Sequence, residues 1–388
     1  MIIKSILDND LYKFTMQYAV IELFPRAIVR YEFIDRGDTV YPQGFADKLK
    51  REVAKMSQLH LTPDEMEFFE KKCPYLPPTY FDFLKGYRYD PTEVHIDQDG
   101  GKLKVSVEGF WYRTILWEVP LMALISELYF KETNSQPYLD SEIVKIVEDK
   151  AKLYNSLGIT YADFGTRRRF SLYNHDLVVS SLAKFGKPAF VGSSNVYLAY
   201  KYNLTPIGTH AHEWFMFHAA KFGFQIANQL ALQNWANVFQ GELGIALADT
   251  FTSKAFFRVF DTKLAKLFDG VRQDSGDPIE FTKMAIEHYQ KLRIDPKSKV
   301  IIFSDSLNPD KVKKIVEFAK GKIKVSFGIG TNFTNDVGVK PLNIVIKMTA
   351  AKPHGFDWIS TVKLSDAKGK YTGDPQMIEI VKKLLNVN

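Results

Sequence analysis

The stretch GTHAHEW, residues 208–214, places two histidines and a glutamate within four positions of a chain that has eight histidines. A helical zinc motif needs histidines four residues apart with a glutamate beside the first. Here Glu213 adjoins His212, and the next histidine, His218, lies six residues further on. On a strand, His210 and His212 would share a face, but no third ligand follows at a recognisable spacing. A neutral imidazole can instead accept a proton or a phosphoryl group, so the stretch favours transfer chemistry, with a buried core histidine as the alternative for either residue.

Three consecutive arginines follow an apolar run in DFGTRRRFS, residues 163–171. We expect them to open a helix, where the positive end of the helix dipole should repel them. Cations at that place are favourable if an anion binds among them, since helix N-termini and arginine side chains both bind phosphate or carboxylate. The alternative is that they point to solvent or pair with acids. Arg167, nearest the strand end, is the first candidate for an anion ligand.

The stretch GVRQDSGDP divides into two parts. Asp277, Pro278 and Glu280 have the spacing of an N-cap, a first-turn proline and a capping-box acid, which predicts a structural role for Asp277. Arg272 and Asp274 are not explained by capping. Two residues apart at a strand end, their side chains point to one side, where a cation can hold a phosphate and an acid can hold a ribose hydroxyl or a hydrated metal ion.

Two glycines, Gly328 and Gly330, occur in FGIGTN, residues 327–332. They would let backbone N–H groups approach a ligand closely, although a lone GxG is as often a tight turn. Phosphate sites of α/β barrels commonly lie in the last loops of the barrel. The position of these glycines near the end of the strand series therefore favours a phosphate.

Short apolar runs alternate with polar loops and helix-length segments from residue 159 onward, which predicts parallel strands with crossover helices in an α/β barrel. The runs cover residues 159–165, 188–194, 204–210, 244–250, 268–274, 299–305 and 323–330. The carboxyl ends of such strands form one face, where the chemistry-bearing residues should meet. These strand-end residues are Arg167, Asn195, His212, Asp249, Arg272, Asp274, Asp305, Gly328 and Gly330.

The first 115 residues have a different pattern. QDGG at 98–101, between two alternating runs, predicts a hairpin, and NIVIKMTAA and WISTVKLSD near the C-terminus predict two more strands that return to the sheet of the first domain. A chain of 388 residues is too long for one comfortable core, so two domains are expected.

Composition excludes several classes of protein. Cys73 is the only cysteine, which rules out a disulfide framework within the chain and fits a reducing, cytoplasmic setting. WEVPLMALISELYF is the most apolar run, but it falls short of a bilayer span of ~20 residues and predicts a buried helix. The net charge of +6 is modest, and the lysines of the C-terminal half lack interleaved aromatic residues, so we expect small anions rather than nucleic acid.

Taken in order, several blocks resemble the nicotinate phosphoribosyltransferase family, from Leu7 to about Lys370. The blocks are DNDLYKFTMQ, DFGTRRRFS, GTHAHEW, GVRQDSGDP, FSDSLN, FGIGTNFTND, PLNIVIKM and KLSD. The resemblance implies transfer of phosphoribose from phosphoribosyl pyrophosphate to nicotinate, with ATP hydrolysis improving the yield. It also implies an irregular seven-stranded α/β barrel, residues 121–344, beside an α+β sandwich domain built from residues 1–120 and 345–388.

The resemblance also implies roles for individual residues. His212 would be phosphorylated by ATP, with Glu213 as its neighbouring polariser, and His210 stays without a role. The base would stack on Phe164, and Tyr12 would reach the active site of the partner in a homodimer. Mg²⁺ would arrive with the pyrophosphate or ATP, near Asp274 and Asp305, which are expected to assist catalysis. The further substrate-binding candidates are Gly165, Thr166, Arg167, Ser194, Asn195, Arg272, Ser275, Gly328, Gly330 and Thr331.

Ser194 bears on the choice of substrate. A relative that uses nicotinamide carries an acid that recognises the amide, and Ser194 aligns with that acid. An acid would repel the carboxylate of nicotinate, so a serine there favours nicotinate. The rival predictions are nicotinamide or quinolinate phosphoribosyl transfer, and a phosphate-binding barrel that senses nucleotides without turnover.

Overall fold

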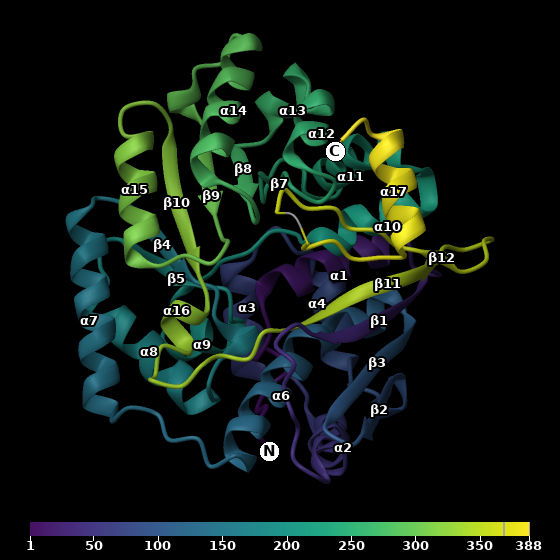
Figure 1. Cartoon of the computed structure of the whole chain (residues 1–388), viewed down its shortest axis with the longest axis vertical. Coiled ribbons are helices and arrows are strands. Elements are labelled where there is room, and N and C mark those ends of the chain that lie inside the picture. The colour runs from purple at the N-terminus through teal and green to yellow at the C-terminus, as the bar shows by residue number, and fades with distance from the viewer. Residues whose placement is uncertain (368, 388) are drawn as a thin grey trace.

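A computed structural model describes residues 1–367 and 369–387 of the chain (Figure 1). Its first sheet joins strands from both ends of the sequence in the order β12–β11–β1–β3–β2, with every neighbouring pair antiparallel. The strands are β1 (Ile28–Asp35), β2 (Val94–Asp99), β3 (Lys102–Phe110), β11 (Ile344–Lys352) and β12 (Ile359–Ser360). The runs on either side of QDGG form the β2–β3 hairpin as predicted, and the late strands do return to this sheet.

The run WISTVKLSD forms a much shorter strand than predicted. Only Ile359 and Ser360 pair with β11, and Lys363 then forms an isolated bridge with Thr372. The chain leaves the sheet because it folds back on itself there, with Lys363 and Thr372 exchanging two backbone hydrogen bonds. This turn places the buried Lys363 close enough to His212 to lower the pKa of that imidazole.

The second sheet is parallel and confirms the predicted seven-stranded α/β architecture. Its order is β6–β5–β4–β10–β9–β8–β7, so the sheet curls with β6 and β7 at its two edges. Each strand lies within one of the seven apolar runs. The strands are β4 (Thr160–Asp163), β5 (Phe190–Ser193), β6 (Thr205–Pro206), β7 (Ile245–Leu247), β8 (Gly270–Gln273), β9 (Val300–Phe303) and β10 (Lys324–Ile329).

Helices pack against both sheets (Figure 1). Before the parallel sheet come α1 (Leu11–Leu23), α2 (Phe45–Lys55), α3 (Pro63–Lys72), α4 (Pro78–Gly86), α5 (Trp111–Thr114), α6 (Glu118–Glu132) and α7 (Asp140–Ser156). Between its strands, and just after the last of them, lie α8 (Leu172–Phe185), α9 (Val196–Lys201), α10 (His212–Phe222), α11 (Phe224–Phe239), α12 (Ser253–Val259), α13 (Thr262–Leu267), α14 (Pro278–Lys291), α15 (Pro309–Ala319) and α16 (Thr331–Thr334). The final helix is α17 (Pro375–Leu384). The apolar run around residue 120 forms α6, which is buried as predicted, and none of the helices in the described residues is long and apolar enough to cross a membrane.

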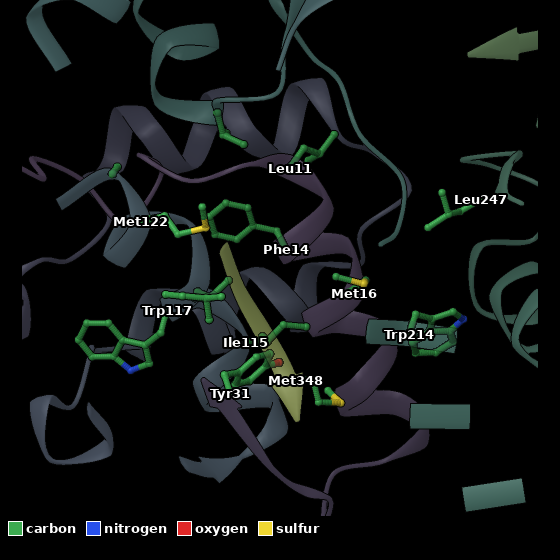
Figure 2. Packing of buried hydrophobic residues seen from close by; sticks show 14 of the residues in the cluster. Leu11, Phe14, Met16, Tyr31, Ile115, Trp117, Met122, Trp214, Leu247 and Met348 are labelled. Carbon is green, nitrogen blue, oxygen red and sulfur yellow. The ribbon is translucent and has the colours of Figure 1, made fainter. Parts of the chain in front are cut away.

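One continuous core lies between the two sheets, and α1 runs through it (Figure 2). Leu11, Phe14 and Met16 of α1 are almost fully buried. They share this core with Met348 of β11, from the antiparallel sheet, and with Leu247 of β7, from the parallel sheet. Helix α1 therefore fixes the N-terminal segment against the parallel sheet of the same chain.

The C-terminal helix packs beside the barrel helices rather than on the antiparallel sheet. Ile378 and Val381 of α17 form a small separate cluster with Val362, Leu364 and Ala255 of α12. The chain after β12 therefore returns to the barrel. The division into residues 1–120 with 345–388 and residues 121–344 stays a prediction, and its last residue, 388, lies outside the described residues.

Candidate active site at the carboxyl ends of the parallel strands

His212 lies at the centre of the strand-end face, as the first residue of α10. Its Nε2 lies 3.1 Å from Asp274 Oδ2, after β8, and its Nδ1 lies 2.9 Å from Thr250 Oγ1, after β7. Burial and the nearby Lys363 hold the pKa of His212 well below its usual value, so the ring is neutral at pH 7. Because a carboxylate can only accept, Nε2 carries the proton, and Nδ1 accepts from the Thr250 hydroxyl.

Asp274 is the acid that orients this imidazole. Burial alone would raise its pKa, but the hydrogen bond from His212, with Arg272 and Lys363 nearby, brings the pKa well below its usual value. Its second oxygen accepts a 2.7 Å hydrogen bond from Ser304 at the end of β9. Side chains from three strand ends, β7, β8 and β9, thus fix one histidine.

Glu213 makes its hydrogen bonds with groups other than His212, although it adjoins His212 in the sequence. Its two oxygens accept hydrogen bonds from Lys13 of α1 and from the Tyr31 hydroxyl of β1. Adjacent residues at a helix start point in different directions, so Glu213 faces the antiparallel sheet while the ring of His212 faces the barrel mouth.

His210 belongs to the segment after edge strand β6 and contacts the other edge strand, β7. The Leu247 N–H of β7 donates to His210 Nε2 at 3.2 Å, and the neighbouring Thr209 hydroxyl donates to Ile245 O at 3.4 Å. Burial, with a contribution from Arg272, lowers the pKa of His210 well below its usual value, so the ring stays neutral and can accept this bond. The structure therefore gives His210 a structural place, which the sequence left undecided.

Asp249 is a strand-end acid to which the sequence assigned no role. It is fully buried, accepts a hydrogen bond from the Ser275 hydroxyl, and has one oxygen without a partner in the described residues. Burial raises its pKa to about 7, against the charge of Lys363. Ser275, a predicted substrate ligand, is occupied on both sides, since its oxygen also accepts from the N–H of Asp366 at 3.1 Å.

The three consecutive arginines have three different environments. Arg169 is fully buried and donates two hydrogen bonds to Asp8, at 2.6 and 2.7 Å. Arg168 has its pKa lowered to about 10 by burial, Arg167 and Arg36, with Asp274 and Asp305 opposing. Arg167 lies 3.7 Å from Glu118 and keeps 36% of its side chain exposed. The α-helix begins only at Leu172, after a short 3₁₀ turn, so the predicted helix-dipole site is absent there and the arginines act by their own charges.

Two lysines that the sequence did not single out add to this cationic face. Burial and the charge of Lys363 lower the pKa of Lys347 to about 7, while Glu118 and Asp274 oppose the shift. Lys347 lies on β11 and Lys363 after β12, so both belong to the antiparallel side of the molecule. They lie within the blocks PLNIVIKM and KLSD. The strand-end rule could not find them because it concerns only the parallel sheet.

Two further charged residues lie at this face: Asp305, after β9, and Arg272, in β8. Asp305 accepts from Lys370 Nζ at 3.1 Å, and the backbone oxygen of Asp305 accepts from Lys311 Nζ at 2.6 Å. Arg272 acts on the pKa of both Asp274 and His210, and its Nε lacks a hydrogen-bond partner in the described residues. Arg272 is therefore a cation available to an anion at this face.

A second group of predicted residues surrounds the N-terminal segment. Asp10 Oδ1 accepts hydrogen bonds from Thr166 at 2.6 Å and from Ser194 at 2.8 Å, and burial raises the pKa of Asp10. Asn195 caps α9 and donates to Asp8 at 2.8 Å. These side chains already bond to one another, so they fix the shape of this part of the face more than they offer free donors.

Tyr12 lies at the mouth of its own barrel. The pKa of Arg167 is raised, and Tyr12 of the same chain is the largest cause. Leu11 N donates to Ser194 O at 2.8 Å, and Gly208 lies so close that a Cβ there would be 3.0 Å from Tyr12 N. This placement follows from the packing of α1 within the core of the same chain, and the reach of Tyr12 into a partner's site stays a prediction.

Gly328 within β10 and Gly330 just after it make room for Phe164. A Cβ on Gly328 would lie 2.3 Å from the Phe164 ring, and one on Gly330 would lie 3.2 Å from Phe164 O. Gly165 is likewise required, because a Cβ there would lie 2.1 Å from Thr334. Phe164 and Thr331 are both half-buried at the strand-end face. The two glycines of the GxG pattern thus allow Phe164 to pack closely against this strand, independently of any ligand that their backbone N–H groups bind.

The site offers charge without a preformed metal cage. Among residues 1–367 and 369–387, no group of three or more histidine, cysteine, aspartate or glutamate residues is arranged to hold a metal ion. Both oxygens of Asp274 already accept hydrogen bonds from protein groups.

Comparison with known proteins gives consistent matches over nearly the whole chain. A model described as the nicotinate phosphoribosyltransferase (NAPRTase) family matches residues 159–388, and one described as the N-terminal domain of that family matches residues 7–126. The chain is 56% identical to the nicotinate phosphoribosyltransferase of Chromohalobacter salexigens over 381 residues, 98% of each protein. It is 52% identical to that of Desulforapulum autotrophicum over 384 residues, 99% of each. The crystal structure of nicotinate phosphoribosyltransferase from Porphyromonas gingivalis matches with a TM-score of 0.97 and 46% identity, covering 100% of both chains.

Proposed function

The chain belongs to the nicotinate phosphoribosyltransferase family, and we propose that it transfers phosphoribose from phosphoribosyl pyrophosphate to nicotinate, releasing nicotinate mononucleotide and pyrophosphate. The observation that carries the proposal is the convergence, at one barrel mouth, of the neutral His212, the Asp274 bonded to it and several cations. Both substrates are anionic, so this charge pattern suits them.

The reaction forms a bond from the nicotinate ring nitrogen to ribose C1 and breaks the bond from C1 to pyrophosphate. Positive charge develops on the sugar and negative charge on the leaving group. Carboxylates such as Asp274 or Asp305 would stabilise the sugar and hold its hydroxyls, and Arg272 would hold the departing phosphates. Arg167 would bind the nicotinate carboxylate, Phe164 would stack on the base, and the Gly330–Thr331 turn would hold the 5′-phosphate.

We propose that ATP phosphorylates His212: a ring nitrogen forms a bond to the γ-phosphorus, the bond from that phosphorus to ADP breaks, and water later releases the phosphate. Its Nδ1 carries a lone pair when Nε2 donates to Asp274, and an exchange of the proton between the two nitrogens would free Nε2 instead. The new phosphate would lie at the start of α10, whose N-cap Ala211 has no side-chain cap for the first-turn N–H groups. Helix N-termini favour anions, and Lys363 adds a second source of positive charge.

Mg²⁺ would enter as the complex of phosphoribosyl pyrophosphate or ATP. Such ions keep several waters and few protein ligands, which fits a face with scattered acids. Asp305, with Asp274 beside it, would hold the waters of the ion.

The preference for nicotinate follows from the surroundings of Ser194. Its hydroxyl donates to Asp10, so one acid already borders this pocket and Arg167 balances it. A second acid at position 194 would face Asp10 directly. A serine there therefore leaves the positive charge of Arg167 for the substrate carboxylate.

The assay for this function incubates the protein with phosphoribosyl pyrophosphate, Mg²⁺ and ATP, and with either nicotinate or nicotinamide. Nicotinate mononucleotide should accumulate, and the nicotinamide reaction should be about tenfold slower or more, since the neutral amide lacks the charge-assisted hydrogen bonds of a carboxylate with Arg167, which are worth about 1.5 kcal/mol or more. If no product forms, the proposed transfer function is rejected, and a barrel that senses nucleotides without turnover is the remaining hypothesis. Equal rates with nicotinate and nicotinamide would reject the proposed preference for nicotinate.

Tyr12 gives a test of how many chains build one site. We propose a homodimer with shared sites, in which Tyr12 reaches the active site of the partner. Tyr12 also lies beside Arg167 of its own chain, so a site completed within one chain is the alternative. Mixing the inactive variants Tyr12→Ala and Arg272→Ala should therefore restore some activity through hybrid dimers. No recovery, with subunit exchange shown by differently tagged chains, would favour sites completed within one chain.

Lys347 predicts a pH dependence. With a pKa of about 7 it is charged below pH 7 and neutral above, and Asp249 becomes negative over the same range. Both changes disfavour a polyanion, so kcat/KM for phosphoribosyl pyrophosphate should fall about tenfold between pH 6 and pH 8. Lys347→Met should lower the value at pH 6 and flatten the profile, while the control Lys352→Met, on the same strand, should keep it. An unchanged slope in Lys347→Met would reject the assignment.

A further inference from the structure

A chain of charged side chains runs from the antiparallel sheet to Arg167. The Tyr31 hydroxyl of β1 donates to one oxygen of Glu213, and Lys13 Nζ donates to the other. Lys13 Nζ also lies 2.5 Å from Glu118 Oε2, at the start of α6, and Glu118 Oε1 lies 3.7 Å from Arg167 Nη1. Each carboxylate therefore uses its two oxygens for two different partners.

Because these charged side chains are buried, removing any one of them is expected to destabilise the others. Lys13 is fully buried, and the side chains of Glu213 and Glu118 are only 6% and 10% exposed. A buried ammonium between two carboxylates is compensated, whereas the loss of one member leaves an unpaired charge. Arg167 is the open end of the chain, with 36% of its side chain exposed at the barrel mouth.

The two contacts of Glu118 are unequal. The 2.5 Å contact with Lys13 is a hydrogen-bonded ion pair, while 3.7 Å to Arg167 is beyond hydrogen-bond length. Lys347 also lowers the pKa of Glu118, after Lys13 and ahead of Arg167. Lys13 thus keeps Glu118 from closing on Arg167, and the guanidinium fork stays available for another carboxylate.

We propose that Lys13 and Glu118 are positioning residues that set how strongly Arg167 binds the carboxylate of nicotinate. The inference rests on the proposed function. Without the ammonium of Lys13, Glu118 would turn to Arg167 and compete with the substrate. Glu213 also holds Lys13 in position, because its carboxylate accepts a hydrogen bond from the Lys13 ammonium on the side away from Glu118. This bond connects the start of α10 to the same series of charged groups.

The test compares Lys13→Met, Glu118→Gln and the double variant in steady-state kinetics with both substrates. Lys13→Met should raise the KM for nicotinate about tenfold or more, while the KM for phosphoribosyl pyrophosphate changes by less than about threefold. The double variant should return the KM for nicotinate to within about threefold of Glu118→Gln, because the competing carboxylate is gone. The matched control is Lys48→Met, which removes the half-exposed partner of Glu132 far from the site and should change neither KM.

Two outcomes would overturn the proposal: a double variant no better than Lys13→Met, or a rise of both KM values by the same factor. If Lys13→Met does not fold by circular dichroism, Glu118→Gln alone decides, since its amide oxygen still accepts from Lys13. It should lower the KM for nicotinate about two- to threefold, and an equal or higher KM would reject the competition. If the unaltered enzyme makes no product, the proposed function fails, and nicotinate binding to the same variants by calorimetry tests the charge chain separately.

Discussion

Replacing His212 with alanine should abolish acid-labile labelling of the protein by γ-labelled ATP while leaving some phosphoribosyl transfer that does not respond to ATP. The ring is neutral, buried and held by Asp274 and Thr250, which is the state of an imidazole that can attack a phosphorus atom. Coupling between two binding events is typically worth 1–3 kcal/mol. The stimulation of kcat/KM by ATP, roughly 5- to 150-fold on that scale, should therefore disappear.

A second substitution separates nucleophile from scaffold. His212→Asn keeps an N–H donor for Asp274 but has no nucleophilic nitrogen, so it should also lose the label and should fold like the unaltered protein. His210→Gln is the matched control: its amide oxygen can accept from Leu247 N, as His210 does, and the label should persist. Label remaining in His212→Asn and vanishing in His210→Gln would move the phosphoryl carrier to His210.

The strand-end rule explains why His212 and Asp274 could be placed at one face from the sequence. Each parallel strand is a short apolar run. Thr250, after β7, and Asp274, after β8, contact His212, and Ser304, after β9, donates to Asp274. Local periodicity carries that information, because crossover helices force all seven strands to point the same way. Hence the fold, and the meeting of His212 with Asp274, followed from the pattern.

What the pattern could not give are partners from distant segments. Glu213 follows His212 directly, yet its partner Lys13 is 200 residues away in sequence and comes from the buried helix α1. Lys347 reaches the site from the antiparallel sheet, where the strand-end rule has no force. The three arginines are adjacent in sequence, but the tertiary fold gives them different partners. Asp8 pairs with Arg169, and Glu118 lies near Arg167. Spacing shows which residues are adjacent in sequence, and packing decides their partners.

Substituting Arg169 with methionine should cause the largest loss of stability among the residues of this region. Its guanidinium is fully buried and makes a two-bond fork with Asp8, which otherwise keeps only Asn195. Leaving a buried carboxylate unpaired typically costs about 3–5 kcal/mol. For a chain of this size the midpoint of thermal unfolding should fall by roughly 5–10 °C, measured by circular dichroism. The exposed control Arg30→Met, which removes the partner of Glu108, should shift the midpoint far less.

The pH dependence of this loss identifies Asp8 as its cause. In the unaltered protein, Arg169 and Asn195 lower the pKa of Asp8 against its burial, so the folded state keeps this stabilisation above the usual pKa of the group and loses it as pH falls through the lowered value. Without Arg169, burial raises the pKa of Asp8, and the folded state takes up a proton. The stability gap between Arg169→Met and the unaltered protein should therefore narrow as pH falls from 7 to about 5, and Asp8→Asn in the variant should recover part of the loss at pH 7. A gap that is constant with pH, and an unimproved double variant, would assign the loss to packing around the methionine instead.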